Sequence, residues 1–237
     1  MSYLYLFRHG QAGTRHDYDT LSGLGREQAR RLGAHLAAEG LRFSAVFSGS
    51  LKRQWETCLE TLRASREAGV EQPEPRVDAG WNEFDMFGIY AALAPRLCAD
   101  DEEFRRGYEE MLVASRNEHA EIQRRWMPCD MEVVWAWVDG RYSYSGESWE
   151  QFLERVRRCR ERLPADADDA AVAVFTSATP VAIVTGLALG VNGRKLFHLA
   201  GALMNTSITV LRGGEGGLDL VNFNGVPHLP PEARTIR

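Results

Sequence analysis

Residues 3–10 read YLYLFRHG and join an apolar run to a cation and an imidazole. The run at 3–7 is apolar on both faces, which is typical of a buried strand in a parallel sheet. Such a strand delivers Arg8, His9 and Gly10 to its carboxyl end, where ligands bind in open α/β sheets. A guanidinium grips phosphate oxygens in a fork, and a neutral imidazole can attack phosphorus. These residue types in this place indicate a phosphate site.

Predicted strands and helices alternate along much of the chain. Short apolar runs indicate strands at 44–48 and 171–175, and Gly213–Gly217 separates two strands of a hairpin, 206–211 and 218–223. Helical spacing of apolar residues indicates helices at 24–38, 51–68 and 180–189. This alternation predicts an α/β fold, a three-layer α/β/α sandwich with a mostly parallel central sheet.

One long segment differs in character from the rest. Residues 84–147 are rich in Arg, Glu, Trp and Met, with helical patches near 102–126 and a turn at Met127-Pro128. We therefore expect a single domain, residues 1–237, with an inserted helical cap at about 84–147. After the insertion, Ser148 and Gln151 have the spacing of a capping box and predict the start of another helix.

Composition excludes several classes of protein. The 237 residues are 44% hydrophobic and 26% charged with a net charge of -5, which is ordinary for a folded chain and argues against a broad nucleic-acid surface. We expect no membrane span, because no run of about 18 apolar residues occurs, and no signal peptide. The four cysteines are widely spaced, form no metal pattern, and predict reduced thiols in a cytoplasmic protein.

Four further segments accompany Arg8-His9-Gly10. They are LSGLGREQA at 21–29, SGSLKRQWET at 48–57, WNEFDMFG at 81–88 and NTSIT at 205–209. Together with the first motif, this ordered series resembles the histidine phosphatase superfamily, also called the phosphoglycerate-mutase-like family. The resemblance extends from Tyr3 to about Phe223, whereas the insertion matches only in position and character.

The resemblance implies roles for the matching residues. His9 would be the nucleophile that takes up the phosphoryl group, and Arg8 and Arg53 would clamp its oxygens. Glu83 would protonate the leaving oxygen and then activate water. Two arginines can supply the positive charge that phosphoryl transfer needs, so we expect no metal and no cofactor, and a small phosphorylated substrate.

One family position is altered. The family usually has Ser-His-Gly after the core strand, but here Ala178 occupies the histidine position. Loss of one such donor typically costs about 10²–10³ in rate. Backbone N–H groups at Ala178 and Thr179, at a helix start, are a partial substitute. We also predict Gln11, Ser22 and Gly23 as phosphate- or substrate-binding residues, with loop structuring and helix capping as their alternatives.

Three functions are open at this stage. The favoured one is a phosphomonoester hydrolase acting through phosphohistidine on His9, weakened by the loss of the second histidine. The others are a phosphoglycerate-mutase-type isomerase and a non-catalytic module that binds phosphate esters. The sequence does not choose the substrate or the pathway, and it leaves a homo-oligomer open.

Overall fold

The computed structural model describes residues 2–117, 126–164, 170–214 and 217–236. The chain divides into two compact units. The first unit contains residues 1–13, 17–83 and 156–237, and the second contains residues 14–16 and 84–155. The second unit thus overlaps the segment expected as an insertion.

A six-stranded sheet forms the centre of the first unit. Its strands are β1 (Tyr3–Arg8), β2 (Ala45–Ser48), β3 (Arg76–Val77), β4 (Ala171–Thr176), β5 (Ile208–Gly214) and β6 (Gly217–Gly225). Their order is β3-β2-β4-β1-β5-β6. The first four are parallel, and β5 and β6 are antiparallel additions at the β1 side. This confirms the α/β fold with a mostly parallel sheet and the C-terminal hairpin.

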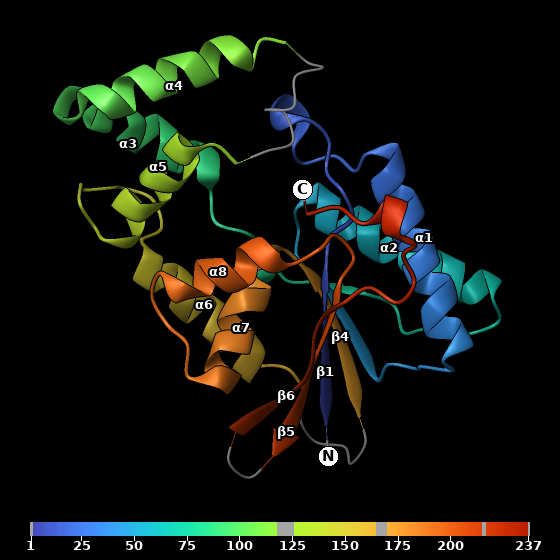
Figure 1. The fold of residues 1–237 in the computed structure, drawn as a ribbon. Helices are drawn as coiled ribbons and strands as arrows, with labels where there is room; N and C mark the ends of the chain where they lie inside the picture. The colour runs from blue at the N-terminus through green and yellow to red at the C-terminus, as the bar shows by residue number, and fades with distance from the viewer. Residues whose placement is uncertain (1, 118–125, 165–169, 215–216, 237) are drawn as a thin grey trace. The chain divides into compact units, whose positions relative to one another are not determined.

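Helices cover both faces of this sheet. Figure 1 shows α1 (Gly23–Ala38) and α2 (Lys52–Glu67) on one side, and α7 (Ala178–Leu189) and α8 (Lys195–Ala202) on the other. Short 3₁₀ turns occur at Ala79–Trp81 and Pro231–Ala233. The short helix α8 was not predicted. The expected start of α7 at Pro180 was wrong by two residues, because a proline is tolerated anywhere in the first turn, where N–H groups lack intrahelical partners.

Aromatic and aliphatic side chains pack between the sheet and helices α1 and α2. Phe7 and Phe175 lie opposite each other in the register of β1 and β4, and their rings stack with centroids 4.9 Å apart. Leu32 and Leu36 of α1 belong to the same buried cluster. Full burial of one such side chain contributes about 1.5–3 kcal/mol, so these contacts hold the carboxyl ends of β1 and β4 firmly together.

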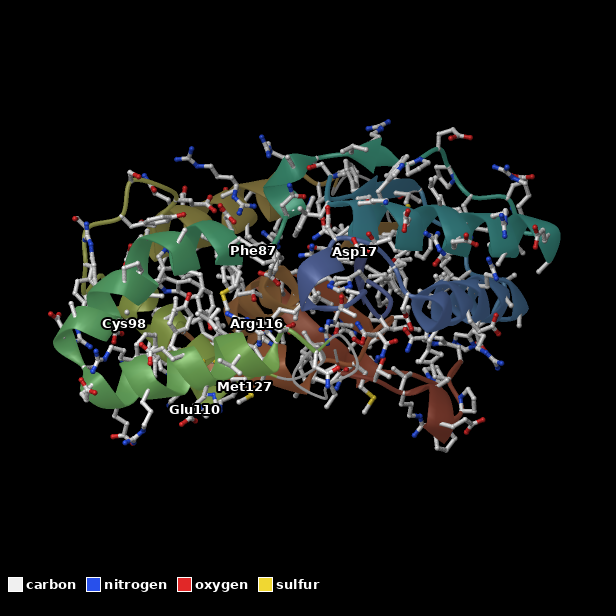
Figure 2. All side chains as sticks on the ribbon, turned by 90° about the horizontal axis from the view of Figure 1, so that it is seen from above. Asp17, Phe87, Cys98, Glu110, Arg116 and Met127 are labelled. Atoms are coloured by element: carbon white, nitrogen blue, oxygen red, sulfur yellow. The ribbon has the colours of Figure 1, made fainter. Side chains whose placement is uncertain are left out.

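The second unit is helical. It contains α3 (Met86–Asp100), α4 (Glu102–Ala114), α5 (Pro128–Val138) and the start of α6 (Trp149–Glu161). In Figure 2, Phe87 and Cys98 mark α3 and Glu110 marks α4. The helix expected near 102–126 ends at Ala114, and residues 118–125 lie outside the described residues. At the expected turn, Pro128 is the first residue of α5, a position that suits its fixed φ.

Local hydrogen bonds fix both ends of this unit. The predicted capping box is confirmed: the Ser148 N–H donates to Gln151 Oε1 at 2.8 Å, and the Gln151 N–H donates to Ser148 Oγ at 3.2 Å. Arg15 binds the buried Asp130 carboxylate through two N–H groups, at 2.9 and 2.7 Å, and Tyr90 donates to the same carboxylate. Burial acts to raise the pKa of Asp130, but the hydrogen bonds from Arg15 and Tyr90 outweigh it and lower that pKa. Asp130 therefore stays charged and holds segment 14–16 in the second unit.

All four cysteines are free thiols. Within the described ranges, the structure has no helix with both the length and the apolar character that a bilayer crossing requires.

Candidate active site

The predicted phosphate site lies at the carboxyl end of β1. Arg8 is paired with Thr176 of β4, and the His9 N–H continues the ladder by donating to Thr176 O at 2.9 Å. On the other side, the Arg8 N–H donates to Ser207 O at 3.3 Å. Because neighbouring strands hold the backbone on both sides, the Arg8 and His9 side chains project from a rigid part of the sheet.

The imidazole of His9 is buried and has a defined tautomer. Its Nδ1 lies 2.7 Å from Gly10 O, and a carbonyl only accepts, so Nδ1 carries the proton. Nε2 then has a lone pair, which accepts from Arg53 Nε at 3.3 Å. Burial, followed by the charges of Arg53 and Arg8, lowers the pKa of His9 well below its usual range. The ring is therefore neutral near pH 7, as a nucleophile must be.

Two buried arginines accompany this imidazole. Arg53, from the first turn of α2, contacts His9 directly, and its guanidinium carbon lies 4.9 Å from the ring centre of Tyr18. Arg8 donates through Nη1 to Leu203 O, and its buried Nε has no hydrogen-bond partner among the described residues. Burial lowers the pKa of Arg8, whereas Tyr18 and Glu83 oppose that effect. Both side chains are guanidinium groups, so the site concentrates positive charge beside a neutral imidazole.

Close backbone packing shapes the loop after His9. The Gly10 N–H donates to the Thr57 hydroxyl at 3.0 Å, and that hydroxyl donates to Arg53 O at 2.6 Å. A Cβ on Gly10 would lie 2.5 Å from Gly25 O, and a Cβ on Gly25 would lie 2.1 Å from Gln11 O. The absence of side chains at both glycines lets α1 approach the His9 loop, and Thr57 links the loop to the helix that carries Arg53.

Glu83 meets the start of α7. Its Oε2 accepts the Thr179 N–H at 3.1 Å, and its charge acts on Arg8. The helix therefore presents a backbone donor to this carboxylate in the structure. Ala178 is the first residue of α7 and directly follows Ser177. The equivalence of Ala178 to the family histidine, and anion binding by Thr179, stay predictions.

Gln11, Ser22 and Gly23 form the entry to α1. The Ser22 hydroxyl donates to Gln11 Oε1 at 2.9 Å and caps the helix by accepting the Gly25 N–H at 3.0 Å. Gly23 is exposed at the first position of α1. These contacts match the loop-structuring and capping alternatives, and substrate binding by the three residues stays a prediction.

Two residues of this neighbourhood were not predicted. Asp19 accepts from Arg53 Nη1 at 2.8 Å, and the Tyr18 ring lies edge-on to His9 with centroids 6.4 Å apart. The sequence showed them only as members of a polar loop. An acid–aromatic pair in the loop that directly follows a suspected anion site was the available signal.

A second support reaches the site from the C-terminal tail. Asn205 Nδ2 donates to His9 O at 3.1 Å, and the Thr206 N–H donates to the same oxygen at 3.3 Å. Thr235 donates to Asn205 Oδ1 at 2.9 Å, and His228 Nε2 lies 2.9 Å from the Thr206 hydroxyl. The tail thus holds the two residues that position the His9 carbonyl.

A family model matches most of the chain, including the motif around His9. The model of the histidine phosphatase superfamily (branch 1) matches residues 4–129 and 107–225. The chain belongs to this superfamily. The bifunctional protein Rv2228c of Mycobacterium tuberculosis is 28% identical over 230 residues, which are 94% of this chain and 54% of that protein. The chain therefore spans about half the length of the curated relatives that it matches.

Solved structures of this superfamily show the same fold. Mycobacterial glucosyl-3-phosphoglycerate phosphatase has a TM-score of 0.59 and 20% identity, with 94% of this chain and 98% of that chain covered. Bacillus stearothermophilus YhfR has a TM-score of 0.62 and 17% identity, with 96% and 99% covered. Phosphoserine phosphatase from Entamoeba histolytica has a TM-score of 0.51 and 17% identity, with 97% and 100% covered. At 17–20% sequence identity, these structures show that the fold is shared.

The donor groups of the site suit an anion. Within the described ranges, no three His, Cys, Asp or Glu side chains lie close enough together to hold a metal ion. The groups around His9 Nε2 are instead guanidinium donors, which match phosphate oxygens.

Proposed function

We propose that this chain is a phosphomonoester hydrolase that forms a phosphohistidine on His9. The observation that carries the proposal is the neutral, buried His9 ring, whose Nε2 lone pair lies against Arg53. The buried Arg8 Nε, which has no hydrogen-bond partner in the part of the chain that the structure describes, is a second donor for a phosphate oxygen. Membership of the histidine phosphatase superfamily and fold neighbours named as phosphatases support the same activity.

In the first step, His9 Nε2 attacks phosphorus as the bond from phosphorus to the ester oxygen breaks. Arg8 and Arg53 stabilise the charge on the transferring group. Protonated Glu83 gives its proton to the leaving oxygen, which departs as an alcohol. Gly10 O keeps the proton on Nδ1 and becomes a partner for the positive charge of the phosphorylated ring.

In the second step, water attacks the same phosphorus and the bond to Nε2 breaks. Glu83, now a carboxylate, takes the proton from that water. The Thr179 N–H, which donates to Glu83 at 3.1 Å, holds the carboxylate in a fixed position for this transfer. Inorganic phosphate leaves, and His9 returns to its neutral form. The proposal needs no metal, because two guanidinium groups supply the positive charge that the phosphoryl group requires.

We further propose that residues 84–147, which lie in the second unit, act as a cap that selects a small phosphorylated substrate in the cytoplasm. A single domain with an insertion explains why the chain enters this unit at Phe84 and leaves it at Arg155. The net charge of -5 makes nucleic acid a poor partner.

The test is rapid-quench release of phosphate from an aryl phosphate. Wild type should release phosphate and form an acid-labile phosphoenzyme, and His9→Ala should abolish both. His198→Ala, a change of an exposed histidine on α8, is the matched control and should behave as wild type. Turnover in His9→Ala equal to wild type would refute the proposed nucleophile.

A third variant, Ala178→His, tests whether the missing donor limits the rate. A restored donor should accelerate release by up to about 10²-fold. Phosphate transfer between hydroxyls of one substrate without release would favour the mutase. Binding without turnover in wild type and in Ala178→His would favour the non-catalytic module.

A further inference from the structure

Arg53, which is proposed to bind phosphate, already binds a carboxylate of the same chain. Asp19 Oδ1 accepts from Arg53 Nη1 at 2.8 Å, and Asp19 Oδ2 accepts the Lys52 N–H at 3.2 Å. Both oxygens of this carboxylate thus bind the first turn of α2. The Asp19 side chain is 51% exposed, whereas that of Arg53 is 7% exposed. A solvent-facing acid therefore covers a buried cation.

Arg53 already uses two of its donors within the chain. Its Nε donates to His9 Nε2 at 3.3 Å, and its guanidinium carbon lies 4.9 Å from the centre of the Tyr18 ring. A guanidinium has five N–H groups, so a phosphate that approaches on the side of Asp19 competes for the Nη1 hydrogen that Asp19 accepts, and one that approaches on the side of His9 competes for the Nε hydrogen. Departure of Asp19 is the easier exchange, because its loop is exposed and its carboxylate regains water.

Two acids, Glu83 and Asp19, lie beside the arginines and the neutral His9 ring of the site. An acid that binds one of these guanidinium groups offsets part of the attraction that the site has for a phosphate ester. Glu83 has a proposed role as proton donor and is held by the Thr179 N–H. Asp19 is the acid whose withdrawal uncovers a phosphate donor.

We propose that Asp19 is an internal ligand of Arg53 that an incoming phosphate group displaces, and that this exchange sets the affinity for phosphate. The inference rests on the proposed function, because it assigns Arg53 to phosphate binding. Only molecules in which Asp19 has left Arg53 bind phosphate at full strength, so the measured affinity for phosphate falls as the fraction with Asp19 bound rises. Removal of the Asp19 charge should therefore tighten phosphate binding.

A purely supporting role for Asp19 makes the opposite prediction. If Asp19 only holds Arg53 in the orientation that binds phosphate, its loss leaves the guanidinium less ordered and weakens binding. The sign of the change in affinity separates the two roles. Stability measurements alone do not, because both roles remove the same ion pair.

The experiment is calorimetric titration of inorganic phosphate into wild type, Asp19→Asn and Asp17→Asn at one fixed ionic strength. Asp17, labelled in Figure 2, is an exposed acid in the same loop whose Oδ1 accepts from the Thr20 hydroxyl at 2.5 Å. Asp17→Asn removes the same charge two residues away and controls for long-range electrostatics. Asp19→Asn should bind phosphate about fivefold more tightly, the upper end for a partly exposed ion pair. Asp17→Asn should stay within about a factor of two of wild type.

Asp19→Ser should also bind phosphate more tightly than wild type. This second variant shows that the gain comes from loss of the Asp19 charge and not from new contacts of the asparagine. Equal or weaker binding in Asp19→Asn, or the same gain in Asp17→Asn, would overturn the inference. If wild type and all variants fail to bind phosphate, the proposed function falls as well. If wild type binds phosphate and Asp19→Asn is no tighter, only the role of Asp19 falls.

Discussion

The Thr57 hydroxyl links the two parts of the site that the proposed phosphoryl transfer requires to be aligned. It accepts the Gly10 N–H at 3.0 Å and donates to Arg53 O at 2.6 Å, and the side chain is fully buried. Thr57→Val preserves the branched shape and removes only the hydroxyl. We expect this change to reduce both stability and activity.

The size of the effect follows from the groups left behind. Arg53 O stays paired, because in an α-helix it also accepts the N–H of residue 57. The Gly10 N–H is buried and loses its acceptor, which costs about 1–3 kcal/mol. For a chain of this size, each kcal/mol lowers the melting temperature by about 2–4 °C. A displaced His9 loop should lower the rate by about 10-fold to 100-fold, since misplacement by 1 Å can cost about 100-fold.

Thr61→Val is the matched control. Thr61 is also fully buried on α2, but its hydroxyl donates to Ala29 O at 3.1 Å, one turn away from the His9 loop. Urea unfolding should show a loss of free energy of unfolding in both variants with unchanged slope. Rapid-quench assays should show a lower rate in Thr57→Val alone. Equal rates in the two variants would refute the reasoning that Thr57 aligns the nucleophile.

Two other perturbations test the packing and the buried charges. Gly25→Ala should destabilise the fold by about 1–3 kcal/mol and lower phosphate release, because its Cβ would lie 2.1 Å from Gln11 O. Gly107→Ala should do neither, because beyond its own helix backbone a Cβ there would meet no described atom within 4 Å. Equal urea midpoints for the two variants would contradict this. Burial, and then His35, lowers the pKa of His228 to about 3, so stability present above pH about 6.5 is lost as the pH falls towards 3. In His228→Asn the free energy of unfolding, measured by urea unfolding, should change with pH less steeply than in wild type, by about 1.4 kcal/mol per pH unit near pH 5. Identical slopes in the two proteins would argue against a buried neutral ring.

Local signals explain what the sequence predicted well. The apolar run of β1 and the alternation of strands and helices depend on residues that are neighbours in the chain, and the capping box of Ser148 and Gln151 lies within four residues. Such patterns retain their meaning in any tertiary context. The same is true of the order Arg8-His9-Gly10, because a strand end places its last side chains at the sheet edge.

Contacts between distant segments explain what the sequence did not predict. Asp19 and Arg53 are 34 residues apart, and Gln11 and Gln28 are 17 apart, so no local pattern marks either pair. Helix α3 contains Pro95, which reads as a helix breaker, yet packing of Leu93 and Leu97 in the second unit outweighs that preference. Propensity is a weak guide wherever tertiary packing decides.

The contacts of the resting site predict what a histidine at position 178 would add to the proposed activity. Three donors that face this region already have partners from the chain: Arg53 Nη1 binds Asp19, Arg53 Nε binds His9, and the Thr179 N–H binds Glu83. A phosphate group gains any of these three hydrogens only by exchange, so each one contributes to binding the difference between phosphate and its present partner, which for Arg53 Nε is the neutral His9 ring. An imidazole at position 178 would add a donor without such a competitor. The Ala178→His change should therefore raise the rate more in wild type, where Asp19 occupies Arg53, than in a site whose donors are free. In the Asp19→Asn background, the gain in rate from Ala178→His should be smaller.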